Sequence, residues 1–110
     1  MTIILTDLPK VSLNKWYAGM HWTKRKKMKD NYTQIVRSQF REVLPKDKSY
    51  SVEYHFKFKN RPLDASNCVA MVKMIEDIIF ESDGYKVIKS ILITSSKGAE
   101  DMVEIKINKK

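Results

Sequence analysis

The sequence predicts an α+β domain, in which a small mixed sheet carries two helices packed on it. Residues 50 to 58 alternate strictly between apolar and polar side chains, which is typical of a strand with one buried face. Residues 28 to 40 carry apolar side chains at helical spacing, and residues 66 to 80 are apolar over most of a helix circumference. With short strands towards both ends of the chain, the predicted order is β-α-β-α-β-β.

The bounds of the other elements follow from turn residues and short apolar runs. Residues 2 to 5 are expected to form the first strand. The first helix should run from about residue 26 to residue 44, because Pro45 disfavours helical backbone at the residue before it. Residues 87 to 94 and 102 to 108 are predicted strands, joined as a hairpin by the turn Ser-Ser-Lys-Gly-Ala.

Length and composition limit the class of protein. The chain has 110 residues, 43% of them hydrophobic, so residues 1–110 are expected to form one domain that a homodimer would help to stabilise.

A single cysteine, Cys68, excludes an internal disulfide and is compatible with a reducing cytoplasm. His21 and His55 form no ligand pattern and are expected to be ordinary surface or loop residues. The sequence shows neither a signal peptide nor a transmembrane stretch, so no membrane partner is expected.

An acidic segment interrupts an otherwise basic chain of net charge +8. Between positions 61 and 83, the only basic residues are Arg61 and Lys73. The acids in this segment are Asp64, Glu76, Asp77, Glu81 and Asp83. A basic surface attracts polyanions, whereas clustered carboxylates repel them unless a divalent cation lies between. This combination is what an enzyme needs to bring Mg²⁺ to a phosphodiester.

A basic cluster begins the first predicted helix, after an irregular segment expected over residues 10 to 24. Its members are Lys24, Arg25, Lys26, Lys27 and Lys29. One interpretation is a phosphate-binding patch whose neighbours Trp16, Tyr17 and Trp22 stack on bases or wedge a junction. The alternative is a solvated helix start, with the aromatic rings in the core. Cations oppose the dipole at a helix N-terminus, so we favour nucleic-acid contact for the cluster; the aromatic residues taken alone are expected to be core.

Helical geometry places Ser66, Lys73 and Asp77 on one stripe of the second predicted helix. Asp64 precedes that helix, and Asp83 lies in a Ser-Asp-Gly turn from which it could fold back toward Asp64. Two carboxylates from separate segments, with waters, suit Mg²⁺ or Mn²⁺. The alternative is an i, i+4 ion pair between Lys73 and Asp77, with two aspartates that only form turns. The apolar circumference of this helix fits either a dimer contact or a helix packed between other layers.

Three segments resemble the RusA family of Holliday junction resolvases, and the predicted order of elements agrees with that family. They are Arg61-Pro-Leu-Asp64-Ala-Ser66-Asn67, a helix with Lys73 and Asp77, and the turn Ser82-Asp83-Gly-Tyr-Lys-Val87. Members are small, dimeric, Mg²⁺-dependent endonucleases with a D-x-D-N motif, a K-x-x-x-D helix and a D-D turn. Ser66 and Ser82 stand where the family has aspartates, and the lysine lies three residues further from Asn67 than usual.

The resemblance implies a Mg²⁺-dependent endonuclease, with Mn²⁺ as an alternative metal, that resolves four-way or branched DNA as a homodimer and needs no organic cofactor. The implied catalytic residues are Asp64, Lys73, Asp77 and Asp83. The implied metal ligands are Asp64, Asp83 and Glu76. The expected DNA-binding residues are Lys24, Arg25, Lys26, Lys27, Lys29 and Arg61. Two alternatives stay open: a catalytically weak or inactive DNA-binding protein of the same fold, and a protein that binds another protein through the acidic segment.

Overall fold

A computed structural model describes all residues from 1 to 110 and contains four strands and three α-helices. The elements in chain order are β1 (Thr2–Thr6), α1 (Leu13–Ala18), α2 (Trp22–Gln39), β2 (Tyr50–Phe58), the short 3₁₀ helix η1 (Ala65–Cys68), α3 (Val69–Ile79), β3 (Ile88–Lys97) and β4 (Met102–Lys109). The predicted α+β class and mixed sheet are confirmed. None of the helices is both long enough and apolar enough to cross a membrane.

The four strands form one sheet in the order β1-β4-β2-β3. Strand β4 is antiparallel to both β1 and β2, whereas β3 is parallel to β2. The predicted hairpin of β3 and β4 is therefore wrong, because β2 lies between them. The connection passes across the end of β2, where the amide of Gly98 donates to the carbonyl of Phe58 at 3.0 Å. A side chain at position 98 would place its Cβ 2.9 Å from the Cβ of Lys57, so glycine suits this crossing.

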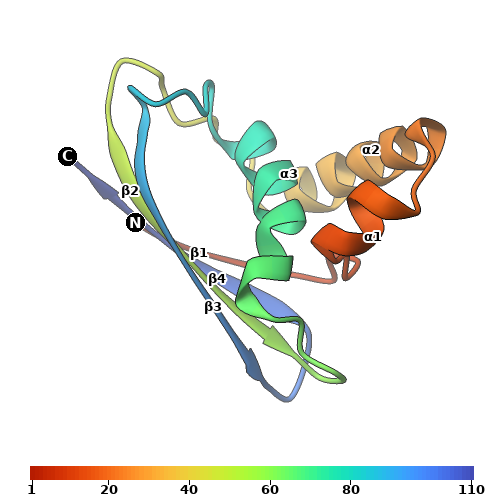
Figure 1. Cartoon of the computed structure of the whole chain (residues 1–110). Helices are drawn as coiled ribbons and strands as arrows, with labels where there is room; N and C mark the ends of the chain where they lie inside the picture. The colour runs from red at the N-terminus through yellow and green to blue at the C-terminus, as the bar shows by residue number, and fades with distance from the viewer.

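All the helices lie on one face of the sheet, and α3 lies between the sheet and the pair α1 and α2 (Figure 1). This position explains why α3 is apolar over most of its circumference. Eight of its eleven residues are buried, whereas Lys73 and Asp77 are exposed. The interpretation of α3 as a helix packed between layers is confirmed, so its apolar surface is not available as a dimer contact.

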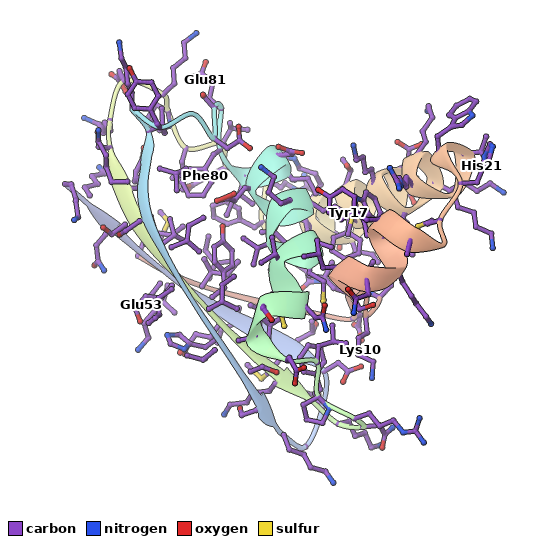
Figure 2. All side chains as sticks on the ribbon, viewed as in Figure 1. Lys10, Tyr17, His21, Glu53, Phe80 and Glu81 are labelled. Carbon is purple, nitrogen blue, oxygen red and sulfur yellow. The ribbon has the colours of Figure 1, made fainter.

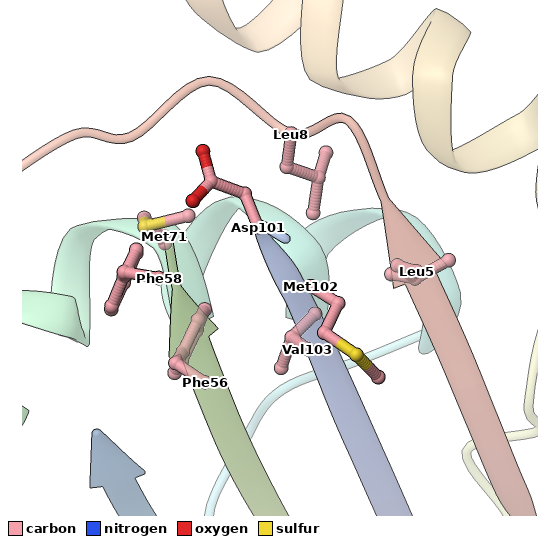
Figure 3. A pocket seen from close by; sticks show the side chains of 8 residues that line it. All are labelled: Leu5, Leu8, Phe56, Phe58, Met71, Asp101, Met102 and Val103. Atoms are coloured by element: carbon pink, nitrogen blue, oxygen red, sulfur yellow. The ribbon is translucent and has the colours of Figure 1, made fainter. Parts of the chain in front are cut away.

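The core is built on the alternating side chains of β2. Tyr50, Val52, Tyr54, Phe56 and Phe58 are all buried beneath the helices, as the alternation predicts. On the other face of the sheet, Glu53 points away from the helices (Figure 2). A cavity of about 10 Å³ lies near the ends of β1, β2 and β4. Figure 3 shows the side chains that line it. That volume is about one water molecule, so the core offers no organic ligand a site.

The first helical region differs from its predicted bounds. A six-residue helix, α1, lies in the segment expected to be irregular, and the hydroxyl of Ser12 caps it by accepting from the amide of Lys15 at 3.1 Å. Helix α2 begins at Trp22 and ends at Gln39 rather than near residue 44. Beyond the helix, Leu44 pairs with the end of α3: its amide donates to the carbonyl of Ile79 at 2.8 Å.

Candidate nucleic-acid interface

Lys73 and three acids of the acidic segment, Glu76, Asp77 and Asp83, lie close together on α3 and in the turn after it. Asp83 follows the helix and folds back, so that its Oδ2 lies 3.7 Å from the Nζ of Lys73. The turn that contains Asp83 is held by the Ser82 hydroxyl, which accepts from the amide of Gly84 at 3.2 Å. The i, i+4 alternative supposed an ion pair between Lys73 and Asp77. In the structure, the ion pair of Lys73 is made with Asp83 instead.

Glu76 is the one buried charged residue of the chain, only 3% exposed, and its Oε2 has no hydrogen-bond partner. Burial raises the pKa of Glu76 to about 7; Asp83 and Asp77 add to the rise and Lys73 opposes it. Burial also raises the pKa of Asp77, and the nearby Asp83 adds to it against Lys73 and Lys29. The three carboxyl groups are thus crowded, with one ammonium in direct contact.

Asp64 lies at the other end of α3. It precedes η1, where its carbonyl accepts from the amide of Asn67 at 2.8 Å, and its side chain makes no capping bond. Asp83 does fold back along α3, and its partner there is Lys73, the fifth residue of the helix.

The predicted metal ligands do not form a set within one chain. No group of three or more histidine, cysteine, aspartate or glutamate side chains is arranged so that it could hold a metal ion. Asp64 does not join Asp83 and Glu76 in such a group, and Ser66, two residues after Asp64, offers only a neutral oxygen. Near Asp64, burial raises the pKa of the Cys68 thiol to about 11, so the thiol stays protonated. The three predicted ligands are therefore not gathered as one set in a single chain.

The basic cluster occupies the first two turns of α2, and most of its ammonium groups are free. Lys26 pairs with Asp30 at 3.4 Å, while Lys24, Lys27 and Lys29 are exposed and form no ion pair. The first turn of α2 holds no acid to offset them. The sixth predicted DNA-binding residue, Arg61, lies in the β2–η1 loop, outside the cluster, with its carbonyl accepting from Lys10 at 3.0 Å.

Two of the three aromatic residues beside the cluster, Tyr17 and Trp22, are not core, contrary to expectation. Tyr17 and Trp22 are each 67% exposed, and Trp16 is half-buried against the core. Arg25 makes cation–π contacts with both Trp16 and Tyr17, and its guanidinium lies 5.7 Å and 5.8 Å from the two ring centres. Sequence reasoning missed this arrangement because it missed α1. Ser12 before the segment and Gly19 after it are the helix-end signals that could have found it.

Comparison with known proteins adds no relative to this picture. No protein-family model and no curated protein matches the sequence. The RusA resemblance therefore rests on the motifs alone. The features of the structure that bear on function are the basic cluster, the exposed rings and the crowded carboxylates.

Proposed function

We propose that this chain is a cytoplasmic protein that binds branched DNA, with the four-way junction as its substrate. The observation that carries the proposal is the basic cluster on α2, in which Lys24, Lys27 and Lys29 form no ion pair and lie beside the exposed rings of Tyr17 and Trp22. The net charge of +8 adds a long-range attraction for a polyanion. Lysines of this kind bind phosphates irrespective of sequence, which suits recognition of DNA shape.

Replacing Lys24 and Lys27 together by alanine should weaken junction binding and make it less sensitive to salt. Each lysine that contacts a phosphate releases about one counterion, so the slope of log K against log salt should fall by about 2 for the pair. The measurement is fluorescence anisotropy of a labelled four-way junction over a series of salt concentrations.

A matched control is the pair Lys46→Ala and Lys48→Ala, two exposed lysines in the α2–β2 connection. This variant should keep the wild-type slope, because its lysines lie outside the basic cluster. An equal loss in both double variants would mean that net charge, and not the cluster, binds the DNA. If the wild type binds no DNA at low salt, the proposal is lost and binding of a protein partner becomes the better interpretation.

Metal-dependent cleavage of the junction is a second candidate function. Asp77 and Asp83 beside Lys73 favour it, because Mg²⁺ is usually held by one or two carboxylates together with waters and substrate phosphates, and the lysine could stabilise a phosphate. The predicted ligands do not meet in one chain, so we derive no step of hydrolysis from them. Cutting two strands symmetrically needs two sites, which the proposed homodimer would supply.

Cleavage is tested by incubating a labelled four-way junction with Mg²⁺, with Mn²⁺ or with a chelator. If the candidate is right, nicking requires metal and falls at least tenfold in Asp83→Asn and in Asp64→Asn. Glu100→Gln, which changes an exposed acid in the β3–β4 connection, should cut like the wild type. Binding without nicking under every metal condition would leave the DNA-binding function and remove the nuclease.

A further inference from the structure

A hollow of about 180 Å³ lies between α3 and the pair α1 and α2, beside the crowded carboxylates. Its apolar wall includes Leu13 and Trp16 of α1 and Met74 of α3. Its polar groups are Lys29 of α2 with Lys73 and Asp77 of α3. Tyr17 also lines it and lies in the space between α3 and the other two helices (Figure 2).

The rings at this hollow are held in place by cations. Arg25 lies against Trp16 and Tyr17, and its Nη2 donates to the carbonyl of Tyr17 at 3.4 Å. The Nζ of Lys29 lies 6.0 Å from the ring centre of Trp16. Such contacts attract a cation to the ring face and restrain both groups. Tyr17 nevertheless remains 67% exposed, so its ring is fixed but still available for stacking.

We propose that this hollow binds one unstacked nucleobase of a DNA strand, with the base on Tyr17 and its phosphate on Lys29 and Lys73. Stacking on an aromatic ring suits any base, because every base has a π face. Lys29 has no ion pair and Lys73 has one carboxylate partner at 3.7 Å, so both retain donors for a phosphate. The inference rests on the proposed DNA-binding function and names the part of the substrate that this site takes.

The carboxylate of Asp77 makes a base a better occupant than a phosphate alone. Asp77 lines the same hollow and lies close enough to both lysines for each to lower its pKa. A carboxylate repels a phosphate but accepts a hydrogen bond from an exocyclic amino group, such as N4 of cytosine. An apolar wall, an exposed ring, two ammonium groups and one acceptor together complement a nucleotide unit. The continuous base stack is interrupted at the branch point of an open four-way junction, which joins this site to the proposed substrate.

The test uses single-stranded DNA that contains 2-aminopurine, a base whose fluorescence falls when it stacks on an aromatic ring. The wild type should quench this fluorescence, and Tyr17→Phe should do the same because it keeps the ring. Tyr17→Ala should abolish the quenching and weaken single-strand binding by about 5- to 150-fold, the usual effect of removing one stacking ring. Tyr85→Ala removes a ring that is 79% exposed elsewhere and should change neither result.

Binding of the four-way junction is measured with the same variants, so that the two proposals can fail separately. The base-binding site would be overturned if the wild type bound the junction but did not quench 2-aminopurine. It would also be overturned if Tyr17→Ala and Tyr85→Ala quenched equally. Either result would leave the proposed function standing. No binding of either DNA would overturn both. Because Tyr17 is largely exposed, its replacement should not unfold the chain, which circular dichroism would verify.

Discussion

Replacing Ile75 by alanine should lower the free energy of unfolding by about 2–5 kcal/mol, the range for removing a large buried aliphatic side chain. Ile75 is fully buried on α3, the helix that lies between the sheet and the pair α1 and α2. The substitution would remove apolar contacts and leave a cavity that neighbouring layers can only partly fill. Urea unfolding followed by circular dichroism measures the change, at two protein concentrations.

The control is Leu92→Ala on the edge strand β3, where the side chain is 51% exposed. An exposed leucine contributes little, so this variant should stay within about 0.5 kcal/mol of the wild type. If Ile75→Ala were as mild as Leu92→Ala, α3 would not lie in the core. A loss for Ile75→Ala that shrinks at high protein concentration would place α3 between two copies of the chain instead of between layers of one.

The parts of the fold that could be predicted are those with a local periodicity. The alternation along β2 specifies its buried face without reference to any other element, and all five of its apolar side chains are buried. The pairing of the last two strands is not local in this sense. A Gly-containing turn between two apolar runs is the usual signal of a hairpin, but here Gly98 serves a crossing over the end of β2. Whether the last two strands pair depends on the insertion of β2 between β3 and β4. That insertion involves contacts distant in sequence, which no short motif encodes.

The candidate site divides in the same way. Helical geometry alone places Lys73 and Asp77 on one exposed stripe, and both are exposed. The partner of Lys73 depends on where the chain turns after α3, which places Asp83 over the lysine. The burial of Glu76 depends on how the layers pack around α3, so its position on the helix did not reveal it. Asp64 and Asp83 flank the helix in sequence, but they do not join Glu76 in one group of three ligands.

Replacing Glu76 by glutamine should stabilise the chain above neutral pH. Burial and neighbouring acids raise the pKa of Glu76 to about 7 in the folded chain, from an ordinary value of 4.5. Between these two values the folded state keeps a proton that the unfolded state has lost, so stability falls as the pH rises through this window. Above pH 7 the ionised carboxylate opposes folding by about 3 kcal/mol. Glutamine cannot ionise, so the Glu76→Gln variant does not lose this stability above pH 7.

The measurement is urea unfolding of wild type and Glu76→Gln at pH 5 and pH 8. The stability of Glu76→Gln relative to the wild type should increase by about 2 kcal/mol between the two conditions. Glu76→Leu separates charge from hydrogen bonding: it should show the same pH trend, whatever its stability at pH 5. A difference that does not grow with pH would mean that the wild type relieves the charge of Glu76 by opening α3 to water. If the trend is found, Glu76 is largely neutral below pH 7, and the ammonium of Lys73 then faces less negative charge and is better able to bind a phosphate.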